Sequence, residues 1–352
     1  MPLRKGWIPA IVAPIVVVAG AIAVPSIADA ASPPQAKTPA QVLALIAGSH
    51  DAHYSGIVEQ TSDLGLPQLP ASMSGTPSSS GFDAASIIGL VTGSHTAQVY
   101  VDGQSRQRVQ LLDTLSERDL IRNGTSIWTY DASTHAAVHV TASGRATKGG
   151  MPHAMTPSTL ANRFISSITT STAVTVTTGT DLGRGVYTLM LEPRTSATLV
   201  RDAVITVDAQ SGVPLGVRVD ARGQSAAAVR VAFRSIDFGQ PDAGLFSFTP
   251  PKGTTIEKAT LPAEPPGGTH ADRARAHKPT VIGSGWTSIV KMPAGTGASG
   301  LGSKGTTLFD ELTQRVDGGR MLQTSLFTVY LRPDGAVFAG AVPPAALLAA
   351  AK

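Results

Sequence analysis

A series of short segments rich in valine, threonine, isoleucine and tyrosine, separated by tight turns, constrains the fold of this chain most. Strands are expected at 53–61, 96–102, 106–113, 117–122, 126–131, 135–140, 173–178, 185–192, 202–208, 214–221 and 227–238. Asp102-Gly103, Asn123-Gly124 and Arg222-Gly223 supply the positive-φ residues that short hairpins need. Because a parallel pair needs a crossover of about a dozen residues, the sequence predicts an antiparallel sheet of about eleven strands.

The strands alternate in polarity, but few helices are available to cover them. In the segment 214–221, three apolar side chains oppose Arg218 and Asp220, which is typical of a sheet with one apolar and one solvated face. Amphipathic helices are expected in only three places, at 38–48, 82–91 and 156–170. Since three short helices are scant cover for so many strands, the pattern predicts an apolar hollow or a thin core.

Residues 1–30 have the layout of a secretory signal peptide. Arg4 and Lys5 precede an apolar run that starts at Ile8, and Ala28-Asp29-Ala30 gives a small-x-small cleavage pattern. An uncleaved membrane anchor is the alternative, because the run continues to Ile27 and is about long enough to span a bilayer. Either reading predicts an exported, extracytoplasmic protein, secreted or anchored at the outer face of the cytoplasmic membrane.

Composition divides the rest of the chain into three parts. Residues 31–256 hold the expected strands and form the main domain, whereas 257–280 is rich in proline, glycine and charge, as linkers are. Residues 281–352 predict a small α+β appendage. Its expected elements are a strand at 287–292, a helix at 306–315, and a hairpin formed by 322–331 and 336–342.

Composition and motifs argue against several classes of function. The absence of cysteine excludes disulfides, thiolate metal sites, thiol nucleophiles and an acylated N-terminal cysteine. The net charge of 28 − 24 = +4 is not clustered, so no nucleic-acid partner is expected. No carboxylate joins His135 and His139 within their segment, and there is no Gly-x-Ser-x-Gly motif. The sequence therefore predicts no enzyme, no metal site and no cofactor.

Residues 117–131, Glu-Arg-Asp-Leu-Ile-Arg-Asn-Gly-Thr-Ser-Ile-Trp-Thr-Tyr-Asp, resemble the xDGxxxWxYD signature of periplasmic lipoprotein carriers of the LolA type. Asn123 stands where those carriers usually have aspartate. Segments 186–193, 203–208, 212–218 and 246–253 follow the order of that family. The segment from His53 to Gln60 is similar to the first strand of the sigma-factor regulator RseB, which shares the fold. The resemblance spans residues 39–255.

The resemblance implies a highly curved antiparallel half-barrel of about eleven strands, closed by short helices over an apolar cavity that holds acyl chains. This agrees with the strands and helices expected from turns and alternation. One departure concerns an arginine near the start of the chain that the carriers use in gating. It has no counterpart here, since residues 39–62 contain neither arginine nor lysine.

We therefore expect an α+β protein that acts as an exported carrier or binder of the acyl chains of a lipid or lipoprotein. The alternative hypothesis is an RseB-like regulatory module that binds a membrane anti-sigma factor or another envelope protein. The expected cavity lining is Trp128, Tyr130, Leu189, Leu191, Val217, Val219, Val231 and Phe233. The expected lid residues are Ile87, Ile88, Leu160, Phe164 and Ile168. A register error of one residue would invert the lining of a strand.

Overall fold

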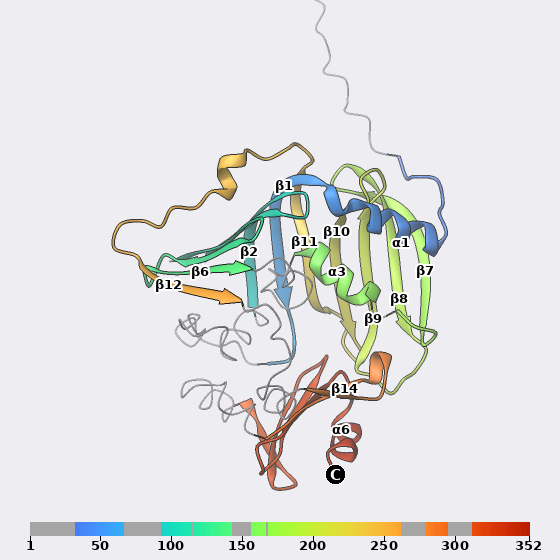
Figure 1. The fold of residues 1–352 in the computed structure, drawn as a ribbon. Helices are drawn as coiled ribbons and strands as arrows, with labels where there is room; N and C mark the ends of the chain where they lie inside the picture. The colour runs from blue at the N-terminus through green and yellow to red at the C-terminus, as the bar shows by residue number, and fades with distance from the viewer. Residues whose placement is uncertain are drawn as a thin grey trace, which may run out of the picture.

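The computed structural model describes residues 32–66, 93–113, 116–142, 156–166, 168–261, 279–294 and 312–352. Its largest element is a strongly curved sheet with the strand order β12-β6-β5-β4-β3-β2-β1-β11-β10-β9-β8-β7 (Figure 1). The strands are β1 (His53–Ser62), β2 (Gly93–Asp102), β3 (Arg106–Asp113), β4 (Ser116–Asn123), β5 (Ser126–Asp131), β6 (Ala136–Ala142), β7 (Thr172–Asp181), β8 (Arg184–Pro193), β9 (Val200–Asp208), β10 (Pro214–Ala221), β11 (Ala227–Asp237) and β12 (Thr255–Leu261).

Neighbouring strands from β1 to β11 pair antiparallel, as the short turns predicted. Glycines with positive φ occupy several of these turns, among them Gly103 at 66° and Gly124 at 61°. All eleven expected segments coincide with strands of this sheet. The described sheet has twelve strands, one more than the eleven expected segments.

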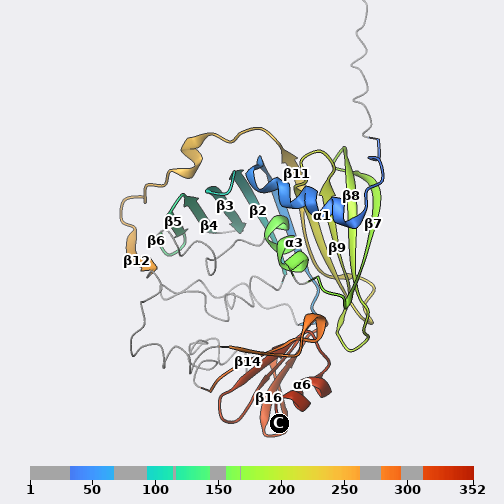
Figure 2. The same cartoon turned by 45° about the vertical axis from the view of Figure 1, so that its right-hand side comes forward.

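The additional strand, β12, begins the segment that was expected to be a linker. Residues Glu257–Leu261 of that segment belong to β12, which pairs in parallel with β6. Parallel pairing is possible here because the long connection from β11, residues 238–254, carries the chain across the sheet to its far edge (Figure 2). This connection contains the short 3-10 helix η3 (Ala243–Phe246).

Two helices pack against one face of the sheet, which we call the concave face (Figures 1 and 2). Helix α1 (Pro39–Gly48) contacts β7 and β8, and α3 (Pro157–Ser166) contacts β10 and β11. Thr38 caps the start of α1 with a capping box, in which its hydroxyl accepts a hydrogen bond from the backbone amide of Gln41 at 3.3 Å. Gly212, with φ of 74°, lies so close to α1 that a Cβ atom would be 2.3 Å from the Leu45 carbonyl oxygen. The turn between β9 and β10 therefore requires glycine to let α1 dock.

Two of the expected helices lie wholly or mostly outside the described residues. The one expected at 82–91 lies outside the described residues. The one expected at 306–315 is wrong at its C-terminal end, because Gln314 and Arg315 belong to strand β15 (Gln314–Val316). A turn at Asp317 and Gly318, both with positive φ, folds β15 back onto the next strand, so Gln314 and Arg315 form cross-strand pairs instead of the end of a helix.

The C-terminal residues form a second sheet with the strand order β13-β14-β18-β17-β16-β15. Its elements are β13 (Thr280–Ile282), η4 (Gly285–Thr287), β14 (Ile289–Met292), β15, β16 (Gly319–Gln323), β17 (Thr328–Leu331), β18 (Val337–Gly340) and helix α6 (Pro344–Ala350). The expected hairpin is present as β17 and β18, with Leu322 in the preceding strand β16. Phe338 and Leu347 are fully buried between this sheet and α6.

Several contacts join the second sheet to the curved sheet. The Leu199 amide donates to the Ala341 carbonyl at 2.8 Å, and the Ser325 amide donates to the Leu64 carbonyl at 3.0 Å. Trp286 of η4 donates from Nε1 to Thr172 Oγ1 at 2.9 Å, and its ring stacks on Phe164 of α3 with centroids 6.1 Å apart. The C-terminal unit is thus attached both to the edge strand β7 and to helix α3.

Candidate ligand-binding cavity

Six of the eight expected lining residues lie together on the concave face. Leu189, Val217 and Val231 belong to one cross-strand row, in which Ile205 lies between Leu189 and Val217. The six are at most 5% exposed and share one apolar cluster with Val42 and Ile46 of α1. They are Leu189, Leu191, Val217, Val219, Val231 and Phe233.

Helix α3 lies over this cluster and carries two of the five expected lid residues, Leu160 and Phe164. Leu160, Phe164 and Ile168, the last just beyond the helix, are partly buried against it, whereas Ile87 and Ile88 lie outside the described residues. The Tyr54 hydroxyl of β1 is 3.3 Å from Ser158 Oγ, which links the sheet to α3.

Tyr54 also supports the middle of the cluster. Its ring packs edge to face on Phe233, with centroids 5.7 Å apart. Burial raises the pKa of Tyr54 above its ordinary value, against the smaller opposing effect of the hydrogen bond with Ser158. The hydroxyl is therefore neutral at physiological pH, and the concave face carries no phenolate at this point.

The other two expected lining residues, Trp128 and Tyr130, lie on the opposite face of the sheet. In β5 it is Ile127 that belongs to the cross-strand row leading to Tyr54, so its neighbour Trp128 points the other way. Trp128 stacks on His139 with centroids 4.1 Å apart, and both Trp128 and Tyr130 contact the ring of Phe248. Their placement corresponds to ordinary packing beneath the segment that follows η3.

That opposite face also buries a charged pair. Arg108 Nη2 is 2.8 Å from Asp119 Oδ2, and Arg108 Nη1 donates to the Leu245 carbonyl at 3.3 Å. Burial raises the pKa of Asp119 above its ordinary value, and the adjacent guanidinium of Arg108 opposes this effect. A cavity of about 250 Å³ lies nearby, lined by Ile121, Asn123, Ser126, Trp128, Phe246, Ser247 and Phe248.

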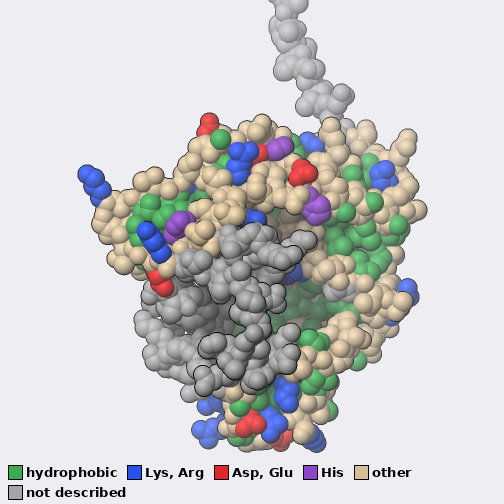
Figure 3. Space-filling model, in the orientation of Figure 1, with side chains coloured by type: hydrophobic (Ala, Val, Ile, Leu, Met, Phe, Trp, Pro, Cys, Tyr) green, Lys and Arg blue, Asp and Glu red, His purple; other side chains and the backbone are tan. Residues whose placement is uncertain are grey.

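Beyond β1 the concave face remains apolar and then becomes cationic. Val99, Val109 and Ile127 are buried there; sequence reasoning omitted them, although their cross-strand pairing could have been traced from the hairpin turns. Two arginines of β4 lie on this face. Arg122 is paired across the strands with Ile127, and Arg118 is paired with Asp131. Figure 3 shows hydrophobic side chains lining a hollow between the curved sheet and the C-terminal sheet.

The two arginines have different partners. Arg118 Nε is 3.2 Å from Asp131 Oδ2, and Arg122 Nε donates to the Gly124 carbonyl at 3.3 Å. Burial tends to raise the pKa of Asp131, but hydrogen bonds from Ser133 and Thr134 and the charge of Arg118 together lower it. Asp131 therefore neutralises Arg118, whereas the carbonyl that accepts from Arg122 carries no charge to neutralise it.

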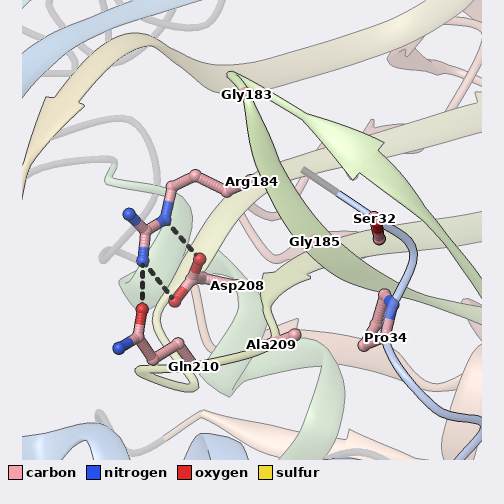
Figure 4. Close-up of a pocket in the computed structure, with 8 residues that line it drawn as sticks. All are labelled: Ser32, Pro34, Gly183, Arg184, Gly185, Asp208, Ala209 and Gln210. Carbon is pink, nitrogen blue, oxygen red and sulfur yellow. Dashed lines mark hydrogen bonds and ion pairs between the residues drawn. The ribbon is translucent and has the colours of Figure 1, made fainter. Parts of the chain in front are cut away.

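A further pocket of about 390 Å³ lies where residues 32–34 cross the start of β8 (Figure 4). Arg184 binds Asp208 through Nε at 2.5 Å and Gln210 through Nη2 at 3.2 Å. Although burial acts to raise the pKa of Asp208, its bonds with Arg184 and Ser211 lower it. None of the expected lining residues borders this pocket, whose walls also include Ser32, Pro34, Gly183, Gly185 and Ala209.

The histidines show no metal-site geometry in the part of the chain that the structure describes. His135 lies in a turn with φ of 51°, and His139 Nε2 is 2.9 Å from Ser126 Oγ. No group of three or more potential ligands from histidine, aspartate and glutamate occurs among the described residues. Among the helices of the described residues, none is long and apolar enough to span a bilayer.

Neither family models nor curated protein sequences match this chain. Among solved structures it is similar to the Pseudomonas aeruginosa MucA/MucB complex, with 13% identity over 88% of this chain and 95% of the other and a TM-score of 0.43. It is similar to an uncharacterized conserved protein from Thermus thermophilus, with 9% identity, coverage of 63% and 100%, and a TM-score of 0.37. The LolA superfamily protein NE2245 from Nitrosomonas europaea has 9% identity, coverage of 60% and 99%, and a TM-score of 0.25. The solved structures to which this chain is similar thus include MucB and a member of the LolA superfamily.

Proposed function

We propose that this protein is an exported binder or carrier that holds the acyl chains of a lipid or lipoprotein against the concave face. The observation that carries the proposal is the apolar cluster that extends over β8–β11 and onto β1–β3 on the face where α1 and α3 lie. Burial of acyl chains against this face would supply affinity at about 0.8 kcal/mol per CH₂ group. The signal-like residues 1–30 support an extracytoplasmic location.

Helix α3 would act as the lid in this mechanism. Its residues Leu160 and Phe164 are only partly buried, so their apolar surface could exchange contact with the sheet for contact with a ligand. Displacement of α3 would also break the stacking of Phe164 on Trp286. Ligand entry would thereby loosen the attachment of the C-terminal unit.

The charge at the far end of the concave face suggests the orientation of the ligand. Arg122 lies on the same face of the sheet as the apolar cluster, and Arg118 is already paired with Asp131. A ligand with acyl chains toward β8–β11 would place its polar end near β4. An anionic head group would be favoured there, because a guanidinium forms strong charge-assisted hydrogen bonds with phosphate or carboxylate.

A fluorescent fatty-acid probe tests which face binds the ligand. We expect the full chain to bind the probe, and we expect Leu160→Asp to weaken binding more than about tenfold because it puts a charge on the lid surface. Trp128→Ala is the matched control on the opposite face and should leave the affinity unchanged. Circular dichroism would establish that both variants are folded. Wild-type affinity in Leu160→Asp, or loss of binding in Trp128→Ala, would contradict the assignment of the concave face.

A regulatory function, in which the chain binds a membrane anti-sigma factor or another envelope protein, is the second proposal. The separate C-terminal sheet, attached to α3 through Trp286, favours it because a second domain offers surface for a protein partner. Affinity capture from solubilised membranes should then recover a partner with a single transmembrane helix. The partner should bind equally well to Leu160→Asp if its site is separate from the concave face.

A further inference from the structure

The outer edge of β7 has the properties of a strand that pairs with another strand. It is the last strand of the curved sheet and runs for ten residues beside β8 without a bulge. Natural edge strands are usually protected from pairing by lysine, proline, bulges or shortness. Between Thr172 and Thr180, β7 contains no charged residue and no proline. The opposite edge, β12, carries Glu257 and Lys258.

The hairpin geometry identifies the backbone groups that face outward. Asp181 and Arg184 flank a two-residue turn, Leu182-Gly183, in which both residues have positive φ. The flanking pair of such a turn is hydrogen-bonded, and bonded and non-bonded pairs alternate along the hairpin. The amides and carbonyls that point away from β8 therefore belong to Val174, Val176, Thr178 and Thr180. Apart from bonds within the sheet, these residues form no backbone hydrogen bond with any other described part of the chain.

The surroundings of β7 leave this edge accessible. Thr175, Thr177, Thr178 and Thr180 are exposed, and β7 is the outermost strand on its side of the sheet in Figures 1 and 2. Thr172 is buried and bonded to Trp286, so the accessible stretch is 173–180.

We propose that the β7 edge binds a second copy of this chain, with the two β7 strands antiparallel about a two-fold axis. Pairing centred on Val176 places Val176 against its own copy and Val174 against Thr178, so that the outward amides of these three residues are hydrogen-bonded. On the other face, Thr175 meets Thr177. Cross-strand pairs of β-branched residues are favourable, and no like charges meet. Because the same edge is used by both copies, association stops at the dimer.

The contact involves one strand from each copy and is therefore small. An interface of this size is typical of weak, reversible association. The dimer should form in a concentration-dependent manner, and the two curved sheets would join into one continuous sheet.

Sedimentation velocity over a wide concentration range tests the proposal. We expect a monomer–dimer equilibrium for the full chain, and a dimer weaker by about tenfold or more in Thr177→Lys, which brings two lysines close together across the axis. Thr178→Pro removes an outward amide from a position that donates no bond to β8, and it should weaken the dimer similarly. Leu112→Lys, at an exposed site inside the sheet, is the matched control and should leave the equilibrium unchanged.

Hydrogen exchange provides a readout that does not depend on the variants. Dimer formation should slow exchange at the amides of Val174, Val176 and Thr178, but not at Thr175 and Thr177, which are already bonded to β8. A chain that stays monomeric at all concentrations would overturn the proposal. So would a dimer that forms equally well in Thr177→Lys and shows no added protection along β7.

Discussion

Replacing Phe233 by alanine is expected to lower the free energy of unfolding by about 3–5 kcal/mol. Phe233 is 4% exposed, belongs to the concave-face cluster and packs edge to face on Tyr54. Removal of the ring leaves a cavity between β11, β1 and α3, since Tyr54 is held by Ser158. Urea unfolding followed by circular dichroism measures the change.

The control for this variant is Met190→Ala. Met190 lies on the opposite face of β8 from the cluster and is 37% exposed, so its truncation should change the free energy of unfolding by less than about 1 kcal/mol. Equal losses in the two variants would show that the concave cluster is not the principal core of the sheet.

Replacing Arg108 by leucine should also be strongly destabilising at neutral pH, by about 3–5 kcal/mol. Arg108 is the partner of Asp119, whose side chain is 4% exposed, and the variant leaves that carboxylate buried without its cation. Asp119→Asn in the same background should recover most of the loss, because the amide has no charge to desolvate. Denaturant unfolding of the single and double variants measures both effects.

The pH dependence of Arg108→Leu has a definite sign. Burial already raises the pKa of Asp119 in the folded protein, and loss of Arg108 removes an influence that lowers it. A raised folded-state pKa means that stability is greatest below the ordinary carboxyl pKa of about 3.9 and falls as pH rises through the folded-state value. The difference between Arg108→Leu and wild type should therefore shrink on acidification. A difference that grew in acid would contradict the buried-pair account.

The turns and β-branched segments were sufficient to predict the strands of the curved sheet, because the relevant information is local. Asp102-Gly103 and Asn123-Gly124 each fix a hairpin by their own backbone preferences. The sequence also predicted α1 and α3, since Thr38 and Thr156 both form caps with nearby residues. Alternation then correctly placed Leu189, Val217 and Phe233 on one face.

The features that were wrong or missing depend on residues distant in sequence. Alternation predicts that Trp128 and Ile127 lie on opposite faces of β5, but it does not predict which of the two faces is concave. The rings of Phe246 and Phe248, far away in sequence, determine that Trp128 packs on the face opposite the concave one. Strand β12 was missed because Glu257 and Lys258 give no local strand signal, and its position depends on pairing with β6. The extent of β15 likewise depends on its partner, β16, rather than on its own periodicity.

The most direct test of the central claim is chemical analysis of what the protein carries. The full chain, exported by a bacterial host and purified without detergent, would be extracted with organic solvent and analysed by mass spectrometry. We predict acyl lipid in near-stoichiometric amount, and markedly less in Leu160→Asp than in Trp128→Ala. A wild-type protein that contains no lipid and takes up no fatty-acid probe would contradict the proposal that the concave face binds acyl chains.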